Sequence, residues 1–215
     1  MKPHQRQSHP SGSRAPAQDE FIFFYFPNAP YGEFCPWYFG PFTVSQAEIA
    51  SLIGQPCELS GANETITFNC AEQFMMYCKA GRFRDFVRQL RIMATASPKE
   101  QKRLGKNTIG CCDRQWDDVK SKVVVAGNVA KFGQNEGLKA KLLATGDRVL
   151  VEASSKDRVW GIGFKEKHAM GHRAEWGENR LGEALMVVRE RLRREEEAQI
   201  RERAEKEPWT IYNNA

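Results

Sequence analysis

Asp157 is one of two acidic residues in this 215-residue chain whose surroundings are those of a catalytic group. It lies in KDRVWGIG (156–163), three residues before Trp160, and Gly161 and Gly163 follow. The segment has a structural interpretation as a charged turn with a core tryptophan and two turn glycines. In the functional interpretation, the carboxylate and the aromatic ring face one substrate, and the glycines let it approach the backbone closely.

Glu72 is the second such acid. The stretch NCAEQFMMYCKAGRF predicts a helix that is capped by Asn69, runs to about Ala80 and stops at Gly81. Glu72 stands at the capping-box spacing from Asn69, which explains its type without any catalysis. A carboxylate in the first turn of a helix can also face a substrate at the helix N-terminus, so both interpretations stand at this point.

If Glu72 and Asp157 share one site, the chemistry that they suit is cleavage of a glycosidic bond. The sugar cation of that reaction needs a nearby carboxylate, and either the water needs a base or the leaving group needs an acid. Backbone N–H groups at Gly161 and Gly163 can approach a phosphate or a ribose. A carboxyl buried beside tryptophan has a raised pKa, which favours Asp157, near Trp160, for the acid or base role.

Further polar and aromatic residues have two interpretations each. Trp116 and Trp160 can pack in the core or hold a flat base by stacking. Arg114 stands near the start of a predicted helix, where an anion is also favoured, but it can equally be a surface charge. Asn179 precedes the last predicted helix and can simply cap it.

The elements that must position these residues are mostly helices. Apolar periodicity, caps and stop signals predict a helix-dominated α+β domain with a few short strands. Strands are predicted at 21–26, 64–69 and 148–153, and helices at 69–80, 84–96, 97–105, 113–135, 137–146 and from 179 to 193. The long helices at 113–135 and 179–193 are expected to pack centrally.

Composition changes mark the ends of this domain. Residues 1–19 are rich in Pro, Ser, Gln and basic residues and predict a disordered tail. Residues 20–193 are expected to form the folded domain. Residues 194–215 form a charged run, which predicts a solvated helical extension or tail. We find no internal repeat.

The charge and the cysteines limit the class of protein. The net charge of +5, from 32 basic and 27 acidic residues, fits an anionic small molecule and is too small for a nucleic-acid footprint. Six cysteines without a C-x-x-C pair predict free thiols and hence a reducing, cytoplasmic location. Neither a membrane span nor a secretory signal is recognisable.

His168 and His172 have the spacing of two metal ligands on a helix. Met170 and Gly171 between them weaken a helix, and no Glu follows His168 as in H-E-x-x-H. We therefore expect two loop histidines, no metal site and no cofactor.

Taken together, the motifs resemble those of the NADAR family, also called YbiA-like proteins, from about Phe21 to Leu192. The resemblance rests on an ordered series rather than on one motif. The series is FYFPNAPYGEF, FNCAEQFMMYCKA, RQWDDVK, AKFGQNEGLKAKLLATGDRVLVEAS, KDRVWGIG and ENRLGEALMVVRERL.

The resemblance implies an N-glycosidase. YbiA-like members hydrolyse ribosylamino-pyrimidine phosphates, early intermediates of riboflavin biosynthesis, and release ribose 5-phosphate; other members act on ADP-ribose conjugates such as ADP-ribosyl guanine. The substrate would thus be a phosphorylated ribosyl N-glycoside, and nucleic acid would be involved only if ADP-ribosylated. The family's acids fall on Glu72 and Asp157. Its other matching positions, taken as substrate contacts, are Lys79, Arg114, Trp116, Trp160, Gly161 and Asn179.

The chain departs from the family pattern in its opening loop and in two insertions. Cys35-Pro36-Trp37 replaces the common Ser-Asn-Phe, which leaves Tyr31, Glu33 and Trp37 as weak candidates for ligand contacts. The insertions, at 45–60 and 165–178, are expected to reshape the mouth of the pocket. A binding module that holds ADP-ribose or a nucleotide without turnover is the alternative to an enzyme.

Overall fold

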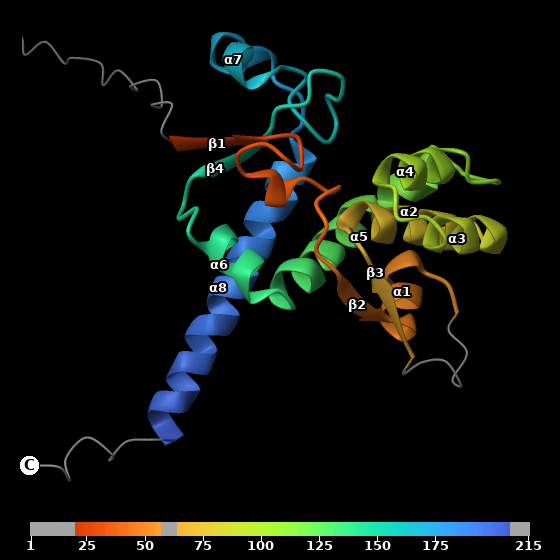
Figure 1. The fold of residues 1–215 in the computed structure, drawn as a ribbon, viewed down its shortest axis with the longest axis horizontal. Coiled ribbons are helices and arrows are strands. Elements are labelled where there is room, and N and C mark those ends of the chain that lie inside the picture. Colours follow the sequence, from red (N-terminus) through yellow and green to blue (C-terminus); the bar gives the residue numbers. More distant parts are fainter. Residues whose placement is uncertain (1–19, 57–63, 207–215) are drawn as a thin grey trace, which may run out of the picture.

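The computed structural model describes residues 20–56 and 64–206, and its helices pack around α5 (Asp113–Gly133). This long helix contacts both α2 (Ala71–Arg82) and α8 (Arg180–Lys206). In Figure 1, α5 runs between the helices α2, α3 and α4 and the long α8. The predicted helix-dominated α+β domain with a few short strands is confirmed, including the central packing of the two long helices.

The other helices are shorter and mostly follow the predicted segments. They are α1 (Gln46–Ile53), α3 (Phe86–Met93), α4 (Pro98–Lys106), α6 (Glu136–Leu143) and α7 (Glu166–Ala169), with 3-10 turns at Gly32–Phe34 and Met170–Glu175. Ser97 caps α4, because its hydroxyl accepts the N–H of Glu100. Within the described ranges, no helix has the length and apolar character that crossing a membrane requires.

Two small sheets complete the fold. Strand β1 (Phe21–Phe24) pairs in parallel with β4 (Val149–Glu152), so that Phe24 lies opposite Glu152. Strand β2 (Phe42–Ser45) pairs antiparallel with β3 (Thr65–Phe68). All four residues of β1 are buried, as expected of a strand that is covered on both faces.

The segment 45–60, expected to be an insertion relative to the family, forms part of the core where the structure describes it, at residues 45–56. Ser45 ends β2 and caps α1 by accepting the N–H of Glu48 through its hydroxyl at 3.2 Å. Ile49 and Ile53 of α1 pack in the same core as Phe42. The sequence prediction missed both β2 and α1. Strand β2 was missed because a four-residue strand within an aromatic loop has too short an apolar alternation to stand out.

Helix α5 separates two hydrophobic clusters. Val124 packs with residues of α8, β1 and β4, including Leu150 and Leu185. Its neighbour Val123 packs with Phe74 of α2 and with β2 and β3. Because the two faces of α5 belong to different clusters, this helix fixes the end of β4 relative to the start of α2.

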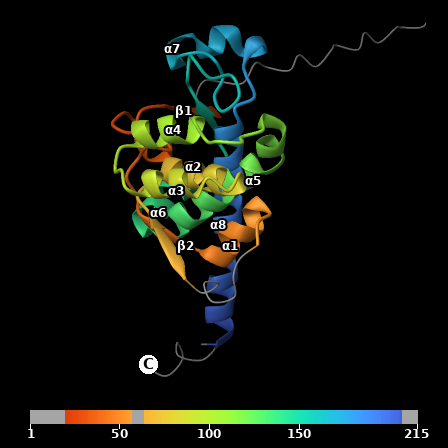
Figure 2. The same ribbon diagram turned by 90° about the vertical axis from the view of Figure 1, so that its right-hand side faces the viewer.

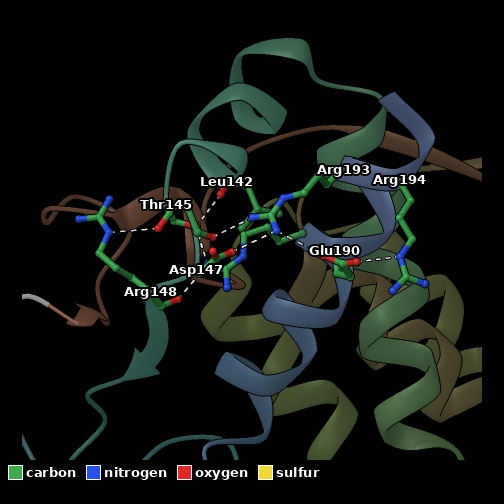
Figure 3. Close-up of polar contacts among 9 residues, drawn as sticks. Leu142, Thr145, Asp147, Arg148, Glu190, Arg193 and Arg194 are labelled. Atoms are coloured by element: carbon green, nitrogen blue, oxygen red, sulfur yellow. Dashed lines mark hydrogen bonds and ion pairs between the residues drawn. The ribbon is translucent and has the colours of Figure 1, made fainter. Parts of the chain in front are cut away.

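Arginines of α8 hold the turn that leads into β4. The buried Arg189 donates to the Thr145 hydroxyl at 2.7 Å and to the carbonyl of Arg148 at 2.9 Å. Arg193 pairs with Asp147 in the same turn at 3.1 Å (Figure 3). These contacts fix the strand that ends at Glu152.

Beyond the packed part of the fold, α8 continues as an exposed, charged helix to Lys206. In Figures 1 and 2 its C-terminal part projects away from the other elements. Ion pairs one turn apart line it, such as Arg191 with Glu195 and Arg194 with Glu190. The tail predicted at 1–19 and the last part of the one predicted at 194–215, residues 207–215, lie outside the described residues.

Candidate active site

Glu72 is buried at the start of α2, with 5% of its surface exposed. Its N–H donates to the carbonyl of Pro36 at 3.0 Å, and Nε1 of Trp37 donates to its Oε2 at 3.1 Å. Burial raises the pKa of Glu72, and this outweighs the opposing effects of Lys102, of the Trp37 hydrogen bond and of Lys106. This acid is therefore held in its protonated form more strongly than an exposed glutamate.

The predicted capping box is wrong by one residue. The N-cap of α2 is Cys70, and the side chain that reaches back is Gln73, whose Oε1 accepts the N–H of Asn69 at 2.8 Å. Asn69 lies outside the helix, and its own side chain is bonded to Ala96 and Gln101. A capping box with Asn69 therefore does not explain why residue 72 is a glutamate.

Asp157 lies in the loop after β4, and its own backbone fixes it. Oδ1 accepts the N–H of Val159 at 2.9 Å and that of Trp160 at 2.8 Å, and its carbonyl accepts the N–H of Gly163 at 3.0 Å. Gly163 adopts a φ of 80°, a conformation that favours glycine. The sequence KDRVWGIG thus folds into a turn that holds one carboxylate at a fixed orientation.

Glu152, at the end of β4, is an acid that the sequence prediction missed. Its Oε2 is buried and, within the described part of the chain, accepts no hydrogen bond. Burial raises its pKa to about 7; the charges of Asp157 and Glu72 also raise it, and that of Lys102 lowers it. The signal was available, because a charged residue closes an otherwise apolar strand in DRVLVEAS.

The three carboxyls therefore form one electrostatically coupled group from three different segments. Asp157 and Glu72 both act on Glu152, and Lys102 of α4 acts on Glu152 and Glu72. Burial raises the pKa of Glu72 and that of Glu152. The environment that was expected around Asp157, a carboxyl buried beside a tryptophan, is found instead at Glu72.

Trp160 is half-buried and packs against the core cluster of α8, β1 and β4. The ammonium of Lys120 lies 5.9 Å from the centre of its ring and also pairs with Asp117. Lys79 and Arg180 lie near enough to lower the pKa of Asp117, after the larger effect of Lys120 itself. Three cations thus act on Asp117, and one of them, Lys120, lies over the ring of Trp160. Of the three, only Lys79 was predicted.

Four other predicted contact residues have structural roles or lie on the surface: Trp116, Arg114, Gly161 and Asn179. Trp116 is buried in the core of α2, β2 and β3, and Arg114 is exposed on the first turn of α5. A Cβ at Gly161 would lie 2.7 Å from the carbonyl oxygen of Glu152, so close packing explains this glycine. The Asn179 amide accepts the N–H of Glu152 at 3.0 Å and donates to the carbonyl of Leu150 at 2.8 Å. Asn179 thus positions Glu152.

The opening loop is held in place by Lys131, which is fully buried. Its ammonium donates to the carbonyls of Glu33 at 2.7 Å and Cys35 at 3.4 Å and lies 5.5 Å from the ring centre of Tyr38. Of the three weak candidates, Trp37 reaches Glu72, Glu33 pairs with Lys141, and Tyr31 is exposed.

A cavity of about 940 Å³ lies along β1. Its lining includes Tyr25, Tyr31, Arg148, Lys156 and Lys165, and it borders the turn that carries Asp157 without including any of the three carboxyls.

His168 and His172 do not converge on a shared ligand. The ring of His172 stacks on Phe164 and bonds to Glu175. Among residues 20–56 and 64–206, no group of three His, Cys, Asp or Glu side chains is arranged to hold a metal ion.

Comparison with known proteins gives one consistent result. A family model described as the NADAR domain matches residues 23–193. An N-glycosidase of Acanthamoeba polyphaga mimivirus is 37% identical over 135 residues, which are 62% of this chain and 79% of the relative. The N-glycosidase YbiA of Shigella flexneri is 30% identical over 175 residues, 81% of this chain and 90% of the relative. The NMR structure of Escherichia coli YbiA superimposes with a TM-score of 0.61 at 30% identity and covers 84% of this chain and 89% of that one.

Proposed function

The chain belongs to the NADAR domain family, and from that premise we propose that it is an N-glycosidase acting on a phosphorylated ribosyl N-glycoside. It is a hydrolase of N-glycosyl bonds, in line with its relatives. We propose ribosylamino-pyrimidine 5-phosphates as substrates, with ribose 5-phosphate and a free aminopyrimidine as products.

The observation that carries this proposal is the coupled group of carboxyls with unequal environments. Cleavage of an N-glycosidic bond needs a proton for the leaving nitrogen and negative charge near the ribosyl cation. Glu72, whose pKa is raised by burial, suits the first task. Asp157, held by two backbone N–H groups, suits the second. Carboxyls in different environments take different roles in such reactions.

The aromatic and cationic residues are our candidates for binding the two ends of the substrate, the pyrimidine and the phosphate. Trp160 is half-buried and offers a face for the pyrimidine. Lys120 lies over its ring, Lys79 acts on the same Asp117 that pairs with Lys120, and two ammonium groups suit a phosphate. We assign the phosphate contact to these two lysines rather than to the exposed Arg114.

The test is release of ribose 5-phosphate from a ribosylamino-pyrimidine phosphate by the purified chain. We expect Glu72→Gln and Asp157→Asn each to lower kcat by at least about 100-fold, the usual contribution of a positioned acid or charge. Far-UV circular dichroism and thermal unfolding check that both variants are folded. Full activity in both would contradict the mechanism.

A second candidate substrate is an ADP-ribose conjugate such as ADP-ribosyl guanine. The observation that favours it is a third cation, Arg180, which acts on Asp117 as Lys79 and Lys120 do, because a diphosphate requires more positive charge than a single phosphate. Parallel assays on both substrates separate the two. Activity on ADP-ribosyl guanine alone would replace our first choice.

We further propose that the protein works in the cytoplasm. The five cysteines among the described residues are all free thiols, and three of them are buried. Free thiols persist in reducing compartments. Fractionation of the native cells with detection of the endogenous protein would test this.

A further inference from the structure

Glu152 has a carboxyl oxygen that the fold leaves unused. Its backbone N–H is bonded to Asn179 and its carbonyl accepts the N–H of Ile162, so the end of β4 is rigidly held. Oε2 is nevertheless buried and accepts no hydrogen bond from the described residues. Buried polar atoms in proteins are almost always bonded, and an exception calls for a partner from outside the chain.

Charged groups of three other segments act on Glu152. Asp157 follows it in the loop after β4, Glu72 belongs to α2, and Lys102 belongs to α4. Cys35 of the opening loop is also close enough to sense its charge, and burial raises the pKa of that thiol to about 11. Glu152 is thus the residue on which both predicted catalytic acids act.

We propose that Glu152 is a third catalytic carboxyl and that its Oε2 binds the attacking water and takes its proton. This inference rests on the proposed function. It assigns a task that Glu72 and Asp157 leave open, namely the activation of water. We assign a water molecule to the unused oxygen, because water donates a hydrogen bond to a carboxylate.

The step balances with the three carboxyls as follows. The bond between the ribosyl C1 and nitrogen breaks, its electron pair stays on nitrogen, and the proton of Glu72 moves to that nitrogen. The water oxygen forms a bond to C1, and the water proton moves to the carboxylate of Glu152. Asp157 supplies negative charge while C1 is cationic. Exchange with solvent then returns Glu152 to its ionised form and Glu72 to its protonated form.

The environment of Glu152 suits a base that works near neutral pH. Burial and its neighbours raise its pKa to about 7. A catalytic base is most effective when its pKa lies close to the working pH. Activity should therefore rise with pH through about 7 as Glu152 ionises.

The experiment compares wild type with Glu152→Gln, Glu152→Asp and Glu152→Ala. We expect Glu152→Gln to lower kcat by at least about 100-fold with little change in KM and to lose the acidic limb of the pH profile. Glu152→Asp should recover part of kcat. Added formate should restore part of the activity of Glu152→Ala, because a small carboxylate can replace the missing base. A purely structural residue would show neither recovery.

Glu136→Gln serves as the control, since Glu136 is exposed in the first turn of α6 and should leave kcat unchanged. The inference is overturned if Glu152→Gln keeps wild-type kcat, or if its remaining activity keeps the acidic limb. If wild type itself releases no product from any ribosyl N-glycoside, the proposed function fails instead.

Stability provides a readout that does not depend on activity. The pKa of Glu152 is about 7 in the fold and 4.5 without its environment, so the folded state binds more protons between these values. Wild-type stability therefore falls as pH rises across this range, whereas Glu152→Gln avoids this loss. The difference in Tm, variant minus wild type, should rise from about pH 5 to about pH 8. An unchanged difference would contradict the buried environment of Glu152.

Discussion

Nε1 of Trp37 donates a hydrogen bond of 3.1 Å to Oε2 of Glu72 and thereby joins the opening aromatic loop to the buried acid of α2. The second link between the two segments is the bond from the N–H of Glu72 to the carbonyl of Pro36. The loop that departs from the family pattern therefore orients Glu72 and contributes to its acidity, which burial chiefly determines.

Replacement of Trp37 by Phe should lower kcat about 10-fold, because the ring remains while one hydrogen bond to the acid is lost. That hydrogen bond favours the ionised form of Glu72, so its loss raises the pKa of Glu72. We expect the alkaline limb of the pH profile to move to higher pH. Trp176→Phe is the control, since it also removes one indole hydrogen bond, to the carbonyl of Ala169. Equal effects in both variants would contradict the prediction.

Lys131→Met should remove a pH dependence of stability. Burial lowers the pKa of Lys131 from 10.5 to about 8, so above about pH 8 the unfolded state binds more protons than the folded state. Stability from this group therefore rises with pH through that range, by up to about 3 kcal/mol. Denaturant unfolding at about pH 7.5 and about pH 9 should show this rise in wild type relative to Lys131→Met. A constant difference between the two proteins would show that the ammonium is not buried as described.

Asn179→Ala should destabilise the fold by about 2–3 kcal/mol, because it leaves a buried N–H of Glu152 and a buried carbonyl of Leu150 without partners. Asn179→Asp keeps the acceptor and loses the donor, so its loss should be smaller. The free energy of unfolding in urea checks both. An equal loss in the two variants would contradict the role of the side-chain oxygen as the acceptor for Glu152.

Arg189→Met should cost about 2 kcal/mol, because two hydrogen bonds to the turn before β4 are lost in a buried place. Arg193→Met removes a more exposed contact to the same turn and should cost less than about 1 kcal/mol. Figure 3 shows how Arg193 reaches Asp147. Denaturant titration of the two variants side by side measures the difference. The prediction is wrong if Arg193→Met lowers the free energy of unfolding more than Arg189→Met does.

Replacement of Trp160 should affect substrate binding, whereas replacement of Trp116 should affect stability. Trp160→Leu should raise KM with a small change in stability, because the half-buried ring is the proposed stacking face. Trp116→Leu should destabilise the protein by about 2–4 kcal/mol and leave KM unchanged, because its ring is buried in the core. Steady-state kinetics and thermal unfolding of both variants decide this, and a raised KM in Trp116→Leu would return that residue to the site.

The sequence alone determined the longer helices and the family. Caps and apolar periodicity defined α4, α5 and α8, because local bonds and a single buried face suffice to fix a long helix. The ordered motifs led to the NADAR family, and the comparison confirmed it. Asp157 was recognised from its position in a turn that its own neighbours close.

Only the tertiary structure decided which groups meet. Glu72 changed from a capping residue to a buried acid because Gln73 takes the bond to Asn69, a difference of one residue that spacing cannot resolve. Glu152 joined the carboxyls because its raised pKa depends on neighbours from α2 and α4, which are distant in sequence. Electrostatic coupling depends on distance in space. The chain order of these residues therefore could not reveal it.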